Sequence, residues 1–373
     1  MSRSTPAACP ALLALPALLA LACRGPAADT GAPADGAPAW SVADLGAPGP
    51  HGVGYAVQEV VYTEPLHGGS RALRLAAWYP STADTVAAEI RYNGAFLRTG
   101  AVADAPASAG RFPLVLYSHG HQGFAEASSF LAHHLASHGH IVLAPDHTGN
   151  TLADGADRTT EIYAWRPLDL GAVLDAAPGL GLPVDGDAPV VAFGHSFGGY
   201  TLHAAAGAAY DLGTLGPACA AGTGPGPFCS TYTPALEAAF AGGFAEPRIA
   251  AVASLAPGDH ALFGAGLGQI AVPFLLMLGA EDPGQDGPPI WQELRATPRT
   301  RVDIAGGGHN VFTDFSGALD GGGADLIDPA RGFTLINTYA HAFVRRHAHG
   351  DAAMDAILDG RTPVDPAATV TLP

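Results

Sequence analysis

The apolar residues of this chain fall into short runs separated by longer segments with helical periodicity. The short runs predict buried strands at 114–117, 141–144, 190–193, 250–255, 274–278 and 301–304. The segments between and after them predict helices at 125–137, 162–176, 197–209 and 325–346. Short apolar strands that alternate with helices are typical of a mostly parallel central sheet with helices on both faces. The pattern therefore predicts an α/β fold.

Two further segments surround this predicted core. Residues 57–63 and 71–79 are β-prone with partial alternation, and turn glycines between them predict a hairpin. Residues 210–247 are rich in Gly and Pro and predict an insertion. This insertion is either a partial lid beside the functional site or a plain surface excursion.

The N-terminal residues resemble an export signal. Arg3 precedes an apolar stretch at 11–22 that is too short for a stable membrane anchor. We expect a signal at 1–23, a flexible tether at 24–50, the folded domain at 51–350 and a C-terminal tail at 351–373. The end of the signal fits either a cleavage site or a lipoprotein signal with Cys23 lipidated. The sequence thus predicts an extracytoplasmic protein, secreted or lipid-anchored at a bacterial cell envelope.

The net charge limits the binding partners of the protein, and its cysteines bear on a disulfide. The chain has 17 basic and 34 acidic residues, a formal charge of −17. Such a field repels nucleic acid and anionic membrane surfaces. We therefore expect no nucleic-acid partner, and membrane contact only through an anchor on Cys23. Outside the leader the cysteines are Cys219 and Cys229, for which export favours a disulfide over two separate buried thiols.

The strongest chemical signal is the sequence Gly194-His-Ser196-Phe-Gly198. It follows the apolar run at 190–193 and opens a helix-prone segment. A serine on a tight strand-to-helix turn exposes its hydroxyl, and small neighbours keep the turn free of clashes. Ser196 is therefore the candidate nucleophile.

Partners for this serine follow later in the chain. His309 lies in a glycine-rich loop after the last predicted strand and is the candidate base. Asp282 follows the predicted strand at 274–278 and is the first candidate for the acid that orients His309. Asp259, one strand earlier, is the alternative acid. The order Ser, Asp, His along the chain favours a catalytic use of these residues.

Catalysis by serine also needs donors for a developing oxyanion. The turn after Ser196 offers the backbone N–H of Phe197. The glycine-bounded segment 118–123, at the end of the strand at 114–117, can present the backbone N–H of His121. These two amides are the candidate oxyanion hole.

Several blocks together resemble α/β-hydrolases of the platelet-activating-factor acetylhydrolase and dienelactone-hydrolase-like group, which is related to cutinase-like polyester hydrolases. The blocks are 112–120, 135–147, 194–199 and 309–315. The resemblance implies an α/β-hydrolase fold and a metal-independent serine esterase without cofactor. Members of the group that this chain resembles carry the acid after either the sixth or the seventh strand. Asp259 stands at roughly the first of these places and Asp282 at the second.

The substrate is less defined by the sequence. We expect a small-molecule or polymeric ester, with short or medium acyl esters favoured because no segment resembles a large amphipathic lid. Polyester hydrolysis, acyl transfer to an alcohol and a non-catalytic ligand-binding scaffold are the alternatives. Aromatic residues either line an acyl pocket or pack in the core; they are Phe124, Phe197, Trp165 and Trp291.

The sixteen histidines suggest a metal site as a rival hypothesis. The candidate groups are His119 with His121, His133 with His134, and His341 with His347 and His349. The first group flanks the oxyanion glycine, and the second points to different helix faces. No pair is joined by cysteines or carboxylates at a familiar ligand spacing, so we expect no metal.

Overall fold

The computed structural model describes residues 40–94, 96–284, 286–320 and 326–373. The expected export signal, Cys23 and the tether up to residue 39 lie outside the described residues. Within the described part of the chain, no helix combines the length and the apolar character needed to cross a membrane.

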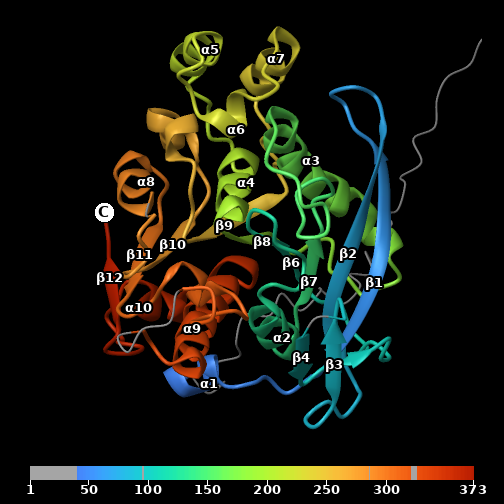
Figure 1. Ribbon diagram of the computed structural model, residues 1–373. Helices are drawn as coiled ribbons and strands as arrows, with labels where there is room; N and C mark the ends of the chain where they lie inside the picture. The colour runs from blue at the N-terminus through green and yellow to red at the C-terminus, as the bar shows by residue number, and fades with distance from the viewer. Residues whose placement is uncertain (1–39, 95, 285, 321–325) are drawn as a thin grey trace, which may run out of the picture.

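A twisted central sheet forms the core of the molecule (Figure 1). Its strand order is β12-β11-β10-β9-β8-β6-β7-β2-β1-β5, and the strands from β7 to β11 run parallel. The strands of this sheet are β1 Gly52–Thr63, β2 Ser70–Ser81, β5 Val102–Ala103, β6 Leu114–Ser118, β7 Ile141–Pro145, β8 Val190–His195, β9 Ile249–Leu255, β10 Phe274–Gly279, β11 Arg299–Ile304 and β12 Ala368–Thr371. The predicted strands and the predicted hairpin of β1 and β2 are confirmed.

Helices cover both faces of the sheet, as predicted. The helices are α1 Val42–Gly46, α2 Ser129–Ser137, α3 Thr160–Ala176, α4 Phe197–Ala205, α5 Leu212–Ala220, α6 Gly226–Cys229, α7 Pro234–Gly242, α8 Gly287–Glu293, α9 Pro329–Ala348 and α10 Asp355–Leu358. Helix α4 stops before the predicted residue 209 because Gly207 has a φ of 92°, which breaks the helical path.

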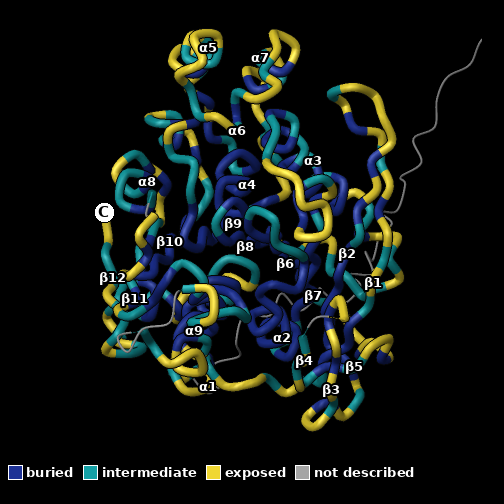
Figure 2. The backbone as a smooth tube through the Cα atoms, in the orientation of Figure 1, coloured by how far each residue is buried: buried dark blue, intermediate teal, exposed yellow. Residues whose placement is uncertain are grey.

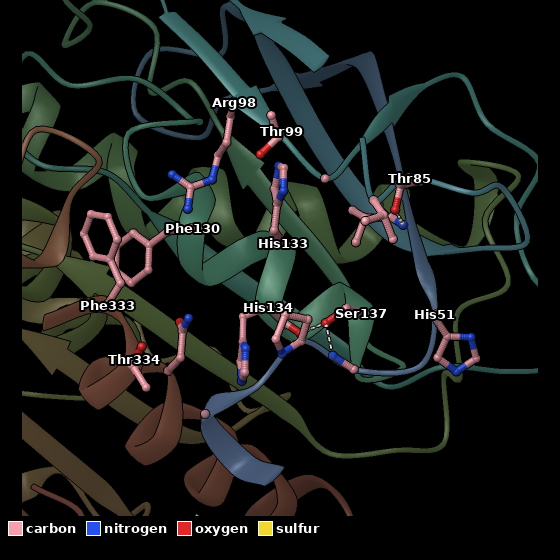
Figure 3. A pocket seen from close by; sticks show the side chains of 17 residues that line it. His51, Thr85, Arg98, Thr99, Phe130, His133, His134, Ser137, Phe333 and Thr334 are labelled. Carbon is pink, nitrogen blue, oxygen red and sulfur yellow. Dashed lines mark hydrogen bonds between the residues drawn. The ribbon is translucent and has the colours of Figure 1, made fainter. Parts of the chain in front are cut away.

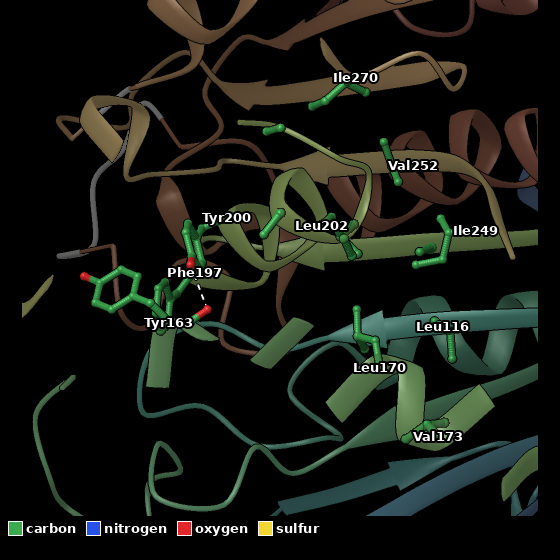
Figure 4. Packing of buried hydrophobic residues seen from close by; sticks show 14 of the residues in the cluster. Leu116, Tyr163, Leu170, Val173, Phe197, Tyr200, Leu202, Ile249, Val252 and Ile270 are labelled. Atoms are coloured by element: carbon green, nitrogen blue, oxygen red, sulfur yellow. Dashed lines mark hydrogen bonds between the residues drawn. The ribbon is translucent and has the colours of Figure 1, made fainter. Parts of the chain in front are cut away.

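Strands β6 to β10 are buried along most of their length, because each faces a hydrophobic layer on both sides (Figure 2). Alternate residues of a strand point to opposite faces. Leu116 and Val252 therefore pack with α3 and α4, as Figure 4 shows, whereas Val115 and Phe193 pack with α2 and α9. The two layers explain why the sequence shows continuous apolar runs here rather than alternation.

The folded domain extends beyond the expected range of 51–350 at both ends. Helix α1 lies in the expected tether, where Ser41 caps its first turn and Leu45 is fully buried. The expected tail contains α10 and β12, and β12 pairs antiparallel with β11 at 301–304. This pairing covers the open edge of β11, which would otherwise expose unpaired backbone groups.

The segment 210–247 holds three helices, α5 to α7, at the top of the view in Figure 1. The Thr160 hydroxyl at the start of α3 donates to the Phe228 carbonyl at 2.6 Å, which ties α6 to the domain. Cys219 and Cys229 form the predicted disulfide. A separate small hairpin, β3 Glu89–Tyr92 with β4 Phe96–Thr99, lies near the end of the β1–β2 ribbon.

Candidate active site

The turn between β8 and α4 places Ser196 in a strained conformation. Its φ of 56° and ψ of −116° lie outside the regions that non-glycine residues prefer. The Ser196 amide donates to the Leu255 carbonyl of β9 at 2.8 Å, which fixes the turn against the sheet. A Cβ on Gly198 would lie 1.9 Å from the Ser118 carbonyl oxygen, and one on Gly194 would lie 2.3 Å from the Gly198 carbonyl oxygen. Only glycine fits at either position, as the sequence predicts.

Two loops at the same sheet edge bring His309 and Asp282 to this serine. His309 Nε2 lies 2.9 Å from Ser196 Oγ. On the other side of the ring, His309 Nδ1 lies 2.7 Å from Asp282 Oδ2. The three side chains predicted as nucleophile, base and acid therefore form one continuous hydrogen-bonded chain.

The carboxylate determines which ring nitrogen of His309 carries the proton. A carboxylate only accepts hydrogen bonds, so Nδ1 donates to Asp282 and Nε2 presents its lone pair to Ser196. Burial raises the pKa of Asp282, but hydrogen bonds from His309 and the Gly284 amide outweigh it and hold this pKa below its usual value. Asp282 therefore stays ionised and can stabilise a positive charge on His309.

Asp259, the alternative acid, is engaged elsewhere. The Arg158 guanidinium donates to its Oδ2 at 3.0 Å, and the Tyr163 hydroxyl donates to its Oδ1 at 3.4 Å. No hydrogen bond joins Asp259 to His309 within the described residues. The geometry thus favours Asp282, which follows β10, over the residue that follows β9.

The loop after β6 lies against the serine, as predicted for an oxyanion loop. Gly120 is so close that a Cβ there would lie 3.4 Å from Ser196 Cβ. The Gly123 amide closes a turn on the Gly120 carbonyl at 3.1 Å, and Gln122 takes a φ of 50° inside it. The amides of His121 and Phe197 have no hydrogen-bond acceptor in the part of the chain that the structure describes. Both are thus free to donate to a ligand.

His119 polarises the peptide that carries one of these amides. The His147 amide donates to His119 Nε2 at 3.0 Å, so this nitrogen holds the lone pair. The proton is therefore on Nδ1, which lies 2.7 Å from the Gly120 carbonyl oxygen and donates to it. Burial, with a smaller effect of the Arg166 charge, keeps the pKa of His119 well below its usual value, so the ring is neutral. A hydrogen bond to the Gly120 carbonyl strengthens the N–H of the same peptide group, that of His121, as a donor.

The Arg166 side chain holds the same loop in place through hydrogen bonds. It is fully buried and donates to the carbonyl of His119 and, at 2.9 Å, to Asn150 Oδ1. The Asn150 amide then donates to His121 Nδ1 at 2.9 Å. Sequence reasoning missed Arg166 and Asn150, because they stand in no motif and reach the loop only through the fold.

His195 was missed as well, although it occupies the variable position before the serine in the glycine motif. Its Nε2 donates to the backbone carbonyl of His309 at 2.9 Å. This bond ties the loop that carries His309 to the end of β8. Burial is the main cause that lowers the pKa of His195, to about 3. The signal available in the sequence was a histidine directly before Ser196, a residue that can donate a hydrogen bond to a neighbouring loop.

The aromatic residues proposed for a substrate pocket separate into two groups. The Phe197 side chain is 2% exposed and stacks on Tyr200 in the core. Trp165 donates to Glu64 at 3.0 Å, and Trp291 lies under Arg299. Phe124 is half-buried and directly follows the oxyanion turn, with its ring 6.0 Å from Phe96 and 5.9 Å from Phe315. Of the four, Phe124 is placed beside the candidate site.

Comparisons with known proteins agree with this architecture. A family model described as Chlorophyllase matches residues 94–215, about a third of the chain, which includes the oxyanion loop and Ser196 but ends before Asp282 and His309. No curated protein sequence matches the chain.

Among solved structures, the chain is similar to a ferulic acid esterase from Streptomyces cinnamoneus. The two share 21% sequence identity and superpose with a TM-score of 0.62, over 86% of this chain and 96% of the esterase. At this identity the likeness concerns the fold, while residue roles rest on the geometry described above. The strand order, the helix layers and this match show that the chain has the α/β-hydrolase fold.

Proposed function

We propose that the protein is an exported serine carboxylic-ester hydrolase that acts on short or medium acyl esters through an acyl-enzyme. The observation that carries the proposal is the chain from Ser196 Oγ through His309 to Asp282, with distances of 2.9 and 2.7 Å. Nucleophile, base and orienting acid at hydrogen-bond distance are what acyl transfer to serine requires. The Chlorophyllase model match and the esterase neighbour support the same class of reaction.

The reaction follows from this geometry. Ser196 Oγ attacks the ester carbonyl carbon while its proton moves to His309 Nε2, and Asp282 stabilises the resulting imidazolium. The amides of Phe197 and His121 donate to the oxyanion of the tetrahedral intermediate. His309 then gives the proton to the leaving alcohol, which yields an acyl-serine and free alcohol. A water molecule, deprotonated by His309, attacks the acyl-serine; the bond to Ser196 Oγ breaks, His309 returns the proton to Oγ, and the acid is released.

In this proposal the apolar part of the ester contacts the half-buried aromatic trio Phe96, Phe124 and Phe315. Phe124 follows the oxyanion loop, and Phe315 follows the short helix His309–Phe312. Two members of the trio therefore follow, along the chain, the segments that hold the candidate oxyanion donor and the base. Aromatic side chains at this place suit a short acyl chain or an aromatic alcohol better than a long lipid chain.

Export is proposed from the N-terminal residues and from the disulfide. A Cys219–Cys229 bond persists in an oxidising compartment. A lipid on Cys23 remains the proposed route to a membrane, and fractionation of cells with and without Cys23→Ala would test it.

The proposed reaction is tested with p-nitrophenyl acetate, butyrate and longer esters, using the purified protein and Ser196→Ala. The wild type should hydrolyse the short esters and release free acid, and Ser196→Ala should lose at least about 10³-fold in kcat. The variant should keep its thermal stability, because the change removes one half-exposed hydroxyl and creates no large cavity. A folded but inert wild type, or a Ser196→Ala variant as active as the wild type, would contradict the proposal.

A further inference from the structure

A group of histidines lies apart from the candidate active site, where α2 and α9 meet α1. His134 and His138 follow the i, i+4 spacing along α2 and its end, so they lie on one side. His341 reaches them from α9. Each of the three offers a ring nitrogen, and these nitrogens lie within 4.8 Å of one another. His134 and His341 are buried and His138 is partly exposed.

Backbone carbonyls fix the protonation of each ring. His134 Nε2 lies 2.9 Å from the Leu45 carbonyl, and His138 Nε2 lies 2.8 Å from the Ala47 carbonyl. His341 Nδ1 faces the Leu45 carbonyl at 3.4 Å. A carbonyl only accepts, so each of these nitrogens is the N–H, and the opposite nitrogen of each ring holds a lone pair.

Two of these lone pairs are buried without a partner. His138 Nδ1 and His341 Nε2 make no hydrogen bond within residues 40–94, 96–284, 286–320 and 326–373. The rings that carry them lie 3.9 Å apart. Burying two acceptors without donors is unfavourable unless something binds them.

The neighbouring histidines behave differently. His140 and His349 face each other through their Nε2 atoms at 2.9 Å, and His140 Nδ1 donates to the Leu135 carbonyl. This fixes the lone pair of His140 on Nε2, where His349 donates to it. This pair satisfies itself, whereas the group of three keeps two unpartnered nitrogens that lie close together; His203 Nδ1 and His260 Nε2, elsewhere in the described residues, also have no partner but belong to no such group.

We propose that His134, His138 and His341 bind a divalent transition-metal ion, for which Zn²⁺ is the best fit. Three neutral imidazoles are a known ligand set for Zn²⁺ and leave one coordination position for solvent. In metal sites the second ring nitrogen of a ligating histidine donates to a carbonyl or carboxylate, as these rings do to Leu45 and Ala47. The nearby Arg345 cation is paired with Asp351 at 2.8 Å, which offsets its charge.

The ion would have a structural role rather than a catalytic one. Ser196 lies at the carboxyl end of β8, whereas His138 comes just before Ile141, the first residue of β7. Parallel strands share their ends, so the histidines lie at the opposite edge of the sheet from Ser196. The bound ion would link α2 to α9, and through the carbonyls of Leu45 and Ala47 it would hold α1 in place.

A route to the site is present. His134 lines a cavity of about 460 Å³ together with Gly46, Ser137 and Asn337, and Figure 3 shows its ring at the cavity wall. The polar groups on this side of the cavity include the Ser137 hydroxyl, which accepts from the Gly49 amide at 2.8 Å. A hydrated ion can therefore approach His134 without unfolding the domain.

The test uses the full-length purified protein, stripped with EDTA and then dialysed against ZnCl₂. Bound zinc is measured by mass spectrometry and the affinity by competition with a chromophoric chelator. The wild type should bind Zn²⁺ stoichiometrically and gain thermal stability. His138→Gln should weaken binding by more than about 100-fold, since even the loss of a second-sphere partner costs about 10–100-fold. Co²⁺ in place of Zn²⁺ should give visible ligand-field bands in the wild type that His138→Gln lacks.

Controls keep the result interpretable. His67→Gln removes an exposed histidine far along the chain from the group and should bind Zn²⁺ as the wild type does. His341→Gln removes the fully buried ligand, and its circular dichroism and ester hydrolysis report whether it still folds. A wild type that binds no Zn²⁺, or that binds it no better than His138→Gln, would overturn the proposal. Neither result bears on the serine chemistry, which is assayed separately.

Discussion

Histidines at the carboxyl ends of the parallel strands (the carboxyl edge of the sheet) and histidines at the amino ends (the amino edge) have different hydrogen-bond partners. At the carboxyl edge, His309 has a carboxylate on one ring nitrogen, Asp282 at 2.7 Å, and a hydroxyl on the other, Ser196 at 2.9 Å. At the amino edge, His138 has a backbone carbonyl on one nitrogen and no described partner on the other. Both arrangements fix the tautomer, but only the carboxylate can neutralise an imidazolium. The first ring is therefore suited to move a proton, and the second to donate a lone pair.

The largest expected effect on kcat comes from replacing Asp282, the carboxylate that distinguishes His309 from the histidines at the amino edge. In Asp282→Asn the amide can donate to His309 Nδ1, which would move the ring proton to Nε2 and leave Ser196 without a base. We expect kcat for p-nitrophenyl butyrate to fall by about 10³–10⁴-fold, with KM little changed. Steady-state kinetics at neutral pH measure this.

The matched control for that variant is Asp259→Asn, which removes the other carboxylate weighed as the acid. Asp259 bonds Arg158 rather than His309, so its loss should change kcat by less than about threefold. If Asp259→Asn is the inactive variant and Asp282→Asn retains activity, the assignment of the acid is reversed.

A smaller effect is expected at the histidine that holds the oxyanion loop. His119→Phe removes the hydrogen bond to the Gly120 carbonyl, and with it the polarisation of the peptide that carries the His121 amide. Direct loss of an oxyanion donor costs about 10²–10³-fold in kcat. His119 acts through the peptide, so we expect about tenfold in kcat and an unchanged KM.

Stability must be separated from positioning in this test. His203 is equally buried and bonds Ser254 at 3.1 Å, away from the oxyanion loop. His203→Phe should lower the melting temperature as much as His119→Phe does, without the loss in kcat. Equal losses of kcat in both variants would reduce the role of His119 to packing.

The sequence predicts the carboxyl edge much better than the amino edge. Strand runs such as 190–193 and the glycines around Ser196 are local signals, because the burial of a parallel strand and the space in a tight turn are set by neighbouring residues. The choice between Asp282 and Asp259 is not local. Both follow strands at the same edge, and only the direction of each loop decides which carboxylate reaches His309.

The amino edge depends on contacts between distant segments. His134 and His138 have a visible i, i+4 spacing, but His341 stands more than two hundred residues later and meets them only when α9 packs on α2. In the sequence His134 stands beside His133, and His341 is close to His347 and His349, so the sequence alone does not point to the group that the fold assembles. Strand β12 was missed for the same reason, since its four residues form a strand only against β11.

A buried histidine that stays neutral, such as His195, also predicts that the stability of the folded state depends on pH. Burial lowers the pKa of His195 to about 3, against about 6.5 in an unfolded chain. Between these values the unfolded state binds a proton that the folded state does not, so stability falls as pH decreases from about 6.5 toward 3. One such proton is worth about 1.4 kcal/mol per pH unit at most. His195→Gln should make the melting temperature less dependent on pH in this range; an unaltered slope would show that His195 takes up its proton in the folded state.

The smallest expected effect is on catalysis when metal is removed from the amino edge. The strands that separate the two edges are buried and continuous, and the hydrogen bonds that order His309 and the oxyanion loop all come from residues at the carboxyl edge. Stripping the protein with EDTA should therefore leave kcat for p-nitrophenyl butyrate within about twofold of its value in excess Zn²⁺. The melting temperature should fall at the same time, because an ion that binds only the folded state stabilises it by mass action. The contrary result would be a loss of kcat that Zn²⁺ restores while the melting temperature stays the same. It would mean that the ion acts on catalysis, and that the histidines at the amino edge are not only ligands of a structural ion.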